Sequence, residues 1–136
     1  MNWDECVLHG VVKKIKPDTN LIGSLIEQSR RKLLTDDFSP MNADTASTKF
    51  SNNYDSLREV LEALAVKFGY KIYNHDCFFG FLKQVLHLEK ESFAFDTFRK
   101  IRNSVNYYGS NLSPEKAALL IKEIRELREL LLKRMV

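Results

Sequence analysis

Apolar residues recur along most of this chain with the spacing of amphipathic helices. The clearest pattern starts at Phe50 and advances in steps of four and three residues, through Tyr54, Leu57, Leu61, Leu64 and Phe68. This spacing places the six side chains on one helical stripe that packs against neighbouring helices. No segment alternates apolar and polar residues for long enough to predict a sheet. The pattern therefore predicts an all-α protein, with Gly69 ending this central helix.

Two helices are predicted before the central one and one directly after it. Residues 3 to 9 form a short first helix that stops near Gly10, and Pro17 opens a second, where its missing N–H costs nothing. The polar segment 35–48 is predicted to be a loop. Asn74 can cap a fourth helix, which contains Gly80. Glycine inside a helix costs about 1 kcal/mol relative to alanine, so either a close helix crossing or chance explains Gly80.

The last two helices are the most clearly delimited. The fifth is predicted to start near Glu91 or Ser92 and to stop at Gly109, with an inward stripe of Phe95, Phe98, Ile101, Val105 and Tyr108. Ser113 as N-cap and Pro114 in the first position open the last helix, whose inner stripe is Ala117, Leu120, Ile124, Leu127 and Leu131. Short connections between long helices imply antiparallel neighbours. We expect one domain over residues 1–136, in which a short segment 1–16 precedes an up-and-down bundle of about five helices over residues 17–136.

Composition narrows the class of protein. The chain is 44% hydrophobic and 29% charged, as globular proteins are, and its net charge of +3 permits an acidic partner such as RNA without demanding one. Cys6 and Cys77 belong to no metal-binding motif, which argues against zinc and a disulfide framework and suits a reducing compartment. Signal-peptide and membrane-spanning patterns are missing. These features predict a cytoplasmic protein that does not associate with a membrane and holds no metal or cofactor.

Polar chemistry gathers at the end of the fifth helix, in the stretch FRKIRNSVNYYG at 98–109. Steps of about 100° per residue put Arg102 beside Asn106 and Asn103 beside Tyr107, on flanks that border each other. An ordinary helix end explains part of this, because arginine favours the helix dipole and asparagine and glycine are common near a C-cap. The other reading is a polar binding site formed by these residues.

Charged pairs elsewhere are weaker candidates. Asp36-Asp37 and Glu89-Glu91 are predicted to be solvated turn residues, since the further ligands of a metal site are not nearby. The run Arg30-Arg31-Lys32 is predicted to be a solvated helix end, with an RNA-contact patch as the alternative.

The motif IRNSVNYYG resembles the signature of the HEPN superfamily of helical-bundle domains. In that signature an arginine, often followed by a polar residue, precedes three variable residues and a histidine; here Arg102 and Asn103 match the first two positions and Tyr107 stands in place of the histidine. Residues 54–82 are also similar to the third-to-fourth helix region of small archaeal and bacterial members, and the likeness covers most of residues 17–136. The resemblance implies metal-independent RNA cleavage in a cleft between two protomers, with Arg102 holding the scissile phosphate. We expect Asn103, Asn106 and Arg99 to bind the ligand beside it.

The tyrosine at position 107 changes what this resemblance implies. An unperturbed tyrosine has a pKa near 10 and is a poor base at neutral pH, whereas histidine titrates near 6.5. Tyr107 can still donate to a phosphate or stack on a base. Among the histidines, His75 lies at the start of the fourth helix next to Asp76, while His87 and His9 lie elsewhere, and each is more often a surface or capping residue than a base.

Two functional hypotheses follow. The first is a homodimer that binds RNA or a nucleotide at paired helix ends, with Arg102 and Tyr107 in a weak or degenerate ribonuclease site. The second is a non-catalytic interaction domain that pairs with a nucleotidyltransferase-type protein in a toxin-antitoxin-like module. The last helix also has apolar residues outside its inner stripe: Leu119, Leu130, Leu132 and Met135. They predict contact with a partner, most simply a second copy of the chain, or else a wide buried face.

Overall fold

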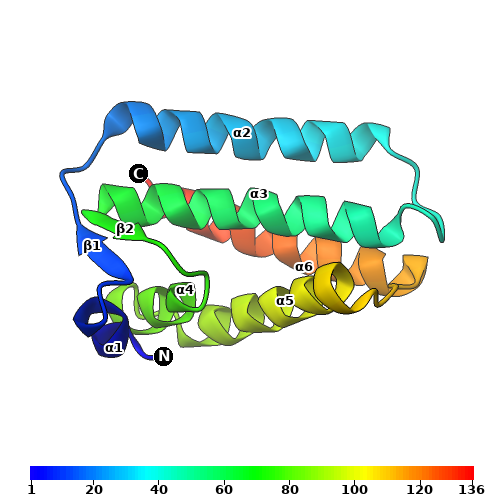
Figure 1. Cartoon of the computed structure of the whole chain (residues 1–136). Helices are drawn as coiled ribbons and strands as arrows, with labels where there is room; N and C mark the ends of the chain where they lie inside the picture. The colour runs from blue at the N-terminus through cyan, green and yellow to red at the C-terminus, as the bar shows by residue number, and fades with distance from the viewer.

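A computed structural model describes the whole chain, residues 1–136, apart from the side chain of Tyr107. The described elements follow in the order α1 (Trp3–Leu8), β1 (Val12–Lys14), α2 (Thr19–Phe38), α3 (Ala46–Lys67), β2 (Tyr70–Ile72), α4 (Cys77–Gly80), the π-helical turn η1 (Phe81–Val85), α5 (Glu89–Tyr108) and α6 (Pro114–Lys133). The long helices run up and down beside one another, which confirms the predicted all-α bundle (Figure 1). Within the described residues, no helix has the length and apolarity needed to cross a bilayer.

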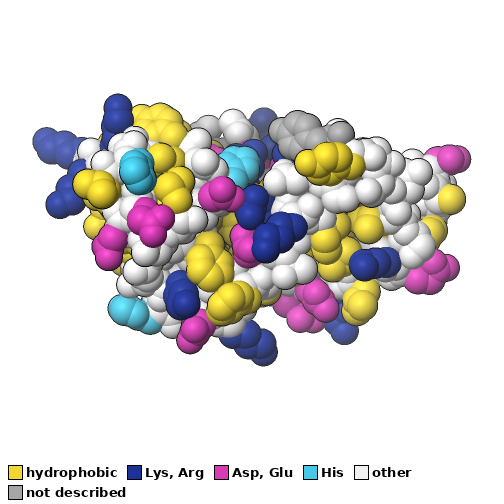
Figure 2. Space-filling model, turned by 60° about the horizontal axis from the view of Figure 1, so that its bottom comes forward, with side chains coloured by type: hydrophobic (Ala, Val, Ile, Leu, Met, Phe, Trp, Pro, Cys, Tyr) yellow, Lys and Arg dark blue, Asp and Glu magenta, His cyan; other side chains and the backbone are white. Residues whose placement is uncertain are grey.

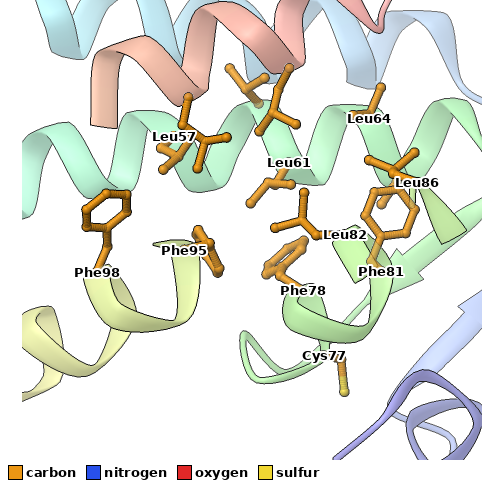
Figure 3. Packing of buried hydrophobic residues seen from close by; sticks show 14 of the residues in the cluster. Leu57, Leu61, Leu64, Cys77, Phe78, Phe81, Leu82, Leu86, Phe95 and Phe98 are labelled. Carbon is orange, nitrogen blue, oxygen red and sulfur yellow. The ribbon is translucent and has the colours of Figure 1, made fainter. Parts of the chain in front are cut away.

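Helix α3 is the central element of the bundle. It lies between α2 on one side and α4 and α5 on the other, and α6 crosses behind it (Figure 1). The stripe predicted from the sequence is buried up to Leu64, while Phe68 at its end is partly exposed. Figure 3 shows Leu57 and Leu61 on α3 above the rings of Phe78 and Phe95. The core therefore forms where α3 meets the helices that follow it.

The boundaries of α2 differ from the prediction at both ends. Asp18 caps the helix by accepting from the backbone N–H groups of Asn20 and Leu21, so Pro17 precedes the cap instead of opening the helix. The helix continues to Phe38, into the segment predicted to be a loop. Its last turn is held because Asp36 is buried and pairs with Lys49 of α3 and Arg125 of α6. The prediction that Asp36 is a solvated turn residue was wrong.

A small antiparallel ladder joins the N-terminal segment to the end of α3. Strands β1 and β2 pair with Val12 opposite Ile72 and Lys14 opposite Tyr70. Three residues per strand are too few to show an alternating pattern, which is why the sequence did not predict them. The ladder brings residues 73–76, which follow β2, to a defined place beside α5.

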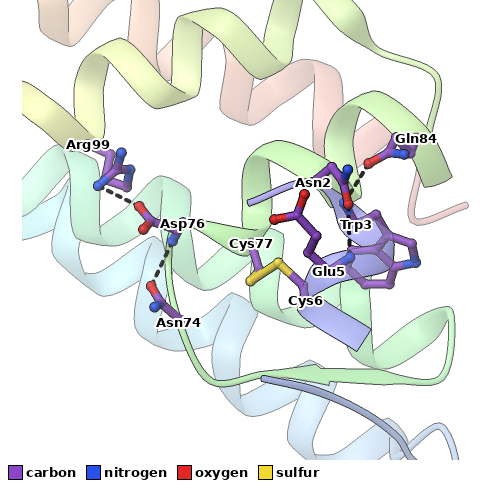
Figure 4. The surroundings of a disulfide bond; sticks show 9 residues. All are labelled: Asn2, Trp3, Glu5, Cys6, Asn74, Asp76, Cys77, Gln84 and Arg99. Atoms are coloured by element: carbon purple, nitrogen blue, oxygen red, sulfur yellow. Dashed lines mark hydrogen bonds and ion pairs between the residues drawn. A yellow bond between two sulfur atoms is a disulfide. The ribbon is translucent and has the colours of Figure 1, made fainter. Parts of the chain in front are cut away.

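Helix α1 packs tightly against α4. A Cβ atom on Gly80 would lie 2.7 Å from the backbone nitrogen of Trp3, so only glycine fits, and the close crossing suggested for Gly80 is confirmed. The sulfur atoms of Cys6 and Cys77 form a disulfide across the same contact (Figure 4). The prediction of unpaired cysteines was therefore wrong, because packing brings together two residues that are 71 positions apart. A disulfide is typical of oxidising compartments, so the cytoplasmic location stays a prediction that this bond does not favour.

The ends of α5 and α6 largely follow the sequence. Helix α5 begins at Glu89, slightly before the predicted start, and Gly109 ends it in the left-handed conformation. Ser113 caps α6 and Pro114 is its first residue, as predicted. The side chain of Tyr108 is 83% exposed, so its predicted place in the core was wrong. The last turn of α5 runs past the core, and Val105, one turn earlier, is already only partly buried.

Candidate functional site

Polar side chains of α5 line a depression on the surface of the protein. It has a volume of about 460 Å³ and is lined by Tyr73, Asn74, His75, Asp76, Arg99, Arg102 and Asn103. Three of the residues proposed from the sequence, Arg99, Arg102 and Asn103, thus meet in one place. Asn106 is exposed and is not among the lining residues. The side chain of Tyr107 lies outside the described part of the structure.

The wall opposite α5 is the segment between β2 and α4. Asn74 accepts from the backbone N–H of Asp76 and so caps the turn that leads into α4. This places the predicted cap in a turn just before the helix. Arg99 then holds the segment to α5, since its guanidinium lies 2.7 Å from Asp76 (Figure 4). It also lies 3.0 Å from Asp96 of α5 itself. Arg99 therefore both lines the depression and holds residues 73–76 against α5.

Arg102 lies between α5 and α3. It donates to a carboxylate oxygen of Asp55 at 3.3 Å, and its guanidinium carbon is 5.7 Å from the centre of the Tyr54 ring. Tyr54 is 1% exposed, and burial raises the pKa of its phenol, which therefore keeps its proton. Neither Tyr54 Oη nor Arg102 Nε has a hydrogen-bond partner among the described residues. Unpaired buried donors are unusual and are often found where a ligand, an ion or ordered water binds.

His75 joins Arg102 in this depression, which the sequence had not favoured. Burial, followed by the positive charges of Arg58 and Arg102, lowers the pKa of His75 to about 4, with Asp55 acting in the opposite direction. The imidazole is therefore neutral at neutral pH and can both donate and accept a hydrogen bond. His9 and His87 do not line the depression.

Carboxylates balance the arginines around the depression. Arg58 pairs with Glu62 and lies 4.0 Å from Asp55, which also receives the bond from Arg102. An incoming anion must therefore compete with Asp55 and Asp76 for the guanidinium groups. The arrangement is suited to a ligand that carries negative charge together with hydrogen-bonding groups.

Some members of this site were not identified from the sequence. The periodicity places Tyr54 in the core, and no sequence motif includes Asp55 or Arg58. The available signal was their spacing, because Asp55 and Arg58 lie one turn apart on α3 and so share a face. What the sequence did not show is that this face meets α5 at Arg102.

Other charged groups have structural partners. Arg30 and Arg31 both bind Glu27 on the surface of α2, and Lys32 binds the buried Glu59. Lys83 lies 3.6 Å from Glu89. Leu130 and Leu132 of α6, and Met135 just after it, pack partly buried against the core, whereas Leu119 of α6 is exposed. Among the described residues, no group of three or more His, Cys, Asp or Glu side chains is placed to hold a metal ion.

Figure 2 views the molecule from the side on which α1, α4 and α5 lie, and basic, acidic and apolar side chains are mixed on this face.

Comparisons of the chain with protein-family models, with curated proteins and with solved structures found no match. The resemblance to the HEPN superfamily stays a prediction, and the function is argued from the depression itself.

Proposed function

We propose that the chain binds RNA or a nucleotide through a phosphate group in the depression between α5 and residues 73–76. The observation that carries this proposal is the meeting of Arg99, Arg102, Asn103 and His75 around one hollow. Arginine suits a phosphate because its planar head donates two parallel hydrogen bonds. The carboxamide of Asn103 and the neutral imidazole of His75 supply further hydrogen bonds. The expected family motif contributes Arg102 and Asn103 to the same hollow.

Arg102 is the central phosphate ligand in this proposal. Its Nε has no hydrogen-bond partner among the described groups, while its NH2 group binds Asp55. A phosphate that draws the guanidinium toward the hollow gives this donor an acceptor. The bond to Asp55 is long at 3.3 Å, so it is a weak competitor for a charged ligand.

Binding is supported more strongly than rapid cleavage. For cleavage, a base takes the proton of the ribose 2′-hydroxyl while its oxygen bonds to phosphorus, and the bond from phosphorus to the 5′ oxygen breaks as that oxygen gains a proton from water. His75 is placed beside Arg102 to accept the first proton. A pKa of about 4 makes it a weak base, so cleavage through His75 is expected to be slow. A bound phosphate raises this pKa, because its negative charge offsets the nearby arginines.

The binding proposal is tested by titrating the protein into fluorescently labelled single-stranded RNA and measuring anisotropy. Arg102→Ala should weaken binding about tenfold or more, since it removes a charged hydrogen-bond donor. Arg30→Ala is the matched control, because Arg30 is an exposed arginine whose partner is Glu27 on the same helix. Equal affinities for wild type and Arg102→Ala would show that the depression is not the binding site.

Cleavage is tested separately by incubating the same RNA with the protein in EDTA. Slow cleavage that is lost in His75→Ala and kept in Tyr107→Phe assigns the proton transfer to His75. The opposite result assigns it to the phenol of Tyr107. Binding without cleavage in the wild type leaves an RNA-binding domain. The predicted homodimer and the nucleotidyltransferase-type partner remain predictions, since no partner chain is described.

A further inference from the structure

A second hollow opens directly beside the phosphate depression. It has a volume of about 580 Å³, within the usual range for small-molecule sites, and it shares Asp76 and Arg99 with the depression. Its other lining residues are Met1, Asn2, Glu5, Phe79, Phe93, Asp96 and Lys100. Because Asp76 and Arg99 line both hollows, a ligand held by Arg99 can extend from one hollow into the other.

Two aromatic rings form the apolar part of this second hollow. Phe79 and Phe93 meet edge to face with their centres 5.1 Å apart. The ammonium group of Lys83 lies 5.5 Å from the Phe93 ring and 5.7 Å from the Phe79 ring. Phe93 is nevertheless 53% exposed, so much of its ring is open to solvent. An exposed ring that a neighbouring ring and a cation hold in place is a suitable surface for stacking a flat ligand.

The polar groups of this hollow differ from those of the depression. Asp76 and Asp96 bind Arg99, and Asp96 also binds Lys100 at 3.1 Å. The exposed carboxylate of Glu5 has no hydrogen bond or ion pair with any described side chain. Carboxylates repel phosphate but accept hydrogen bonds from the amino groups of bases, as they do from the N4 amino group of cytosine. The chemistry of this hollow therefore favours a base, while that of the neighbouring depression favours a phosphate.

We infer that the second hollow is a nucleobase subsite and that the ligand of the paired hollows is single-stranded RNA. One base stacks on the Phe93 ring and donates its exocyclic amino group to Glu5, while a phosphate of the same strand lies against Arg99 and Arg102. Base pairs hide the faces and amino groups that this subsite reads, so a duplex does not fit. The inference rests on the proposed phosphate site and adds both the strand state and the base preference.

The subsite is tested by anisotropy with short labelled oligomers of cytidine and of uridine. Cytosine carries an amino group where uracil carries a carbonyl, and both bases are single pyrimidine rings, so their comparison probes this contact. Wild type should bind the cytidine oligomer about fivefold or more tightly. Phe93→Ala should weaken binding of both oligomers about tenfold, since stacking on an aromatic side chain is lost. Glu5→Ala should remove the preference for cytidine, because no carboxylate is left to accept a hydrogen bond from the amino group.

Phe38→Ala is the matched control, because Phe38 is an exposed phenylalanine on α2 that lines neither hollow. Thermal unfolding of each variant, followed by circular dichroism, shows that the fold is retained. Unchanged affinity in Phe93→Ala, or equal binding of the two oligomers by wild type, overturns the base subsite. If Arg102→Ala still weakens binding in that case, the phosphate site stands without it. A wild type that binds neither oligomer overturns both proposals.

Discussion

Arg102 on α5 donates to Asp55 on α3 at 3.3 Å, across the boundary between two helices that are separated by β2, α4 and η1 in the chain. The pair is partly buried, with 22% of the arginine side chain and 24% of the aspartate side chain exposed. The pair connects Arg102, the residue proposed to bind phosphate, to the central helix α3. A ligand at Arg102 is therefore coupled to the packing of α3 against α5.

Removing this pair should lower stability moderately. Arg102→Ala is expected to lower the free energy of unfolding by about 1–2 kcal/mol, because a charged hydrogen bond in a partly buried place is lost. Arg31→Ala, which removes an exposed contact with Glu27, should cost about 0.5 kcal/mol or less. Urea unfolding measures both. A loss well above 3 kcal/mol would indicate that Arg102 holds a larger buried network and would weaken the binding proposal.

The titration of His75 should be visible as a pH dependence of stability. Its pKa of about 4 in the folded protein lies below the ordinary value of 6.5, so protonation favours the unfolded chain. The resulting stability is present above about pH 6.5 and is lost as the pH falls through about 4. We expect its size to be about 1–2 kcal/mol, less than the full shift implies, because the ring is partly solvated.

The measurement is the difference in unfolding free energy between wild type and His75→Gln across this pH range. The stability of the wild type relative to His75→Gln should fall as the pH falls, because only the wild type carries the titrating ring. Nuclear magnetic resonance of the imidazole protons gives the pKa directly, and addition of RNA should raise it. A pKa near 6.5 in the free protein would mean that His75 is neither buried nor beside the arginines.

The contact between α1 and α4 should tolerate no side chain at position 80. Gly80→Ala is expected to destabilise the protein by about 1–3 kcal/mol, because the new methyl group meets the backbone of Trp3. Gly23→Ala is the control, since no atom lies within 4 Å of a Cβ at that helical position. Glycine disfavours a helix, so the control should stabilise by about 0.5–1 kcal/mol. Thermal unfolding that shifts both variants in the same direction would contradict this packing.

The disulfide between Cys6 and Cys77 should contribute strongly to stability. Reduction is expected to cost about 2–5 kcal/mol, because the bond closes a long loop of the unfolded chain. Thermal unfolding with and without reductant measures this loss. The variant with both Cys6→Ala and Cys77→Ala should be less stable than wild type and insensitive to reductant. Alkylation of two thiols in the denatured, unreduced wild-type protein would show that the bond does not form.

Local features of the sequence were enough to predict the helices. The spacing from Phe50 to Leu64 identified the buried face of α3, and Gly69, Gly109 and the Ser113-Pro114 pair marked helix ends where the structure has them. These features act within one or two turns of the chain, so they can be recognised without knowing the fold. The same limit explains the error at Tyr108, because periodicity shows which way a residue faces and not whether a neighbour covers it.

The composition of the candidate site was decided by tertiary structure. The sequence placed Arg102 and Asn103 on one helix end, but it did not bring His75 to them or Asp55 beneath them. His75 comes from the segment between β2 and α4, which the β1–β2 ladder, the Cys6–Cys77 bond and the close fit of Gly80 against Trp3 hold in place. Each is a contact between residues far apart in the chain, and its formation depends on how the whole core packs. Periodicity along the chain determined the helices, and packing between distant segments determined which side chains share a site.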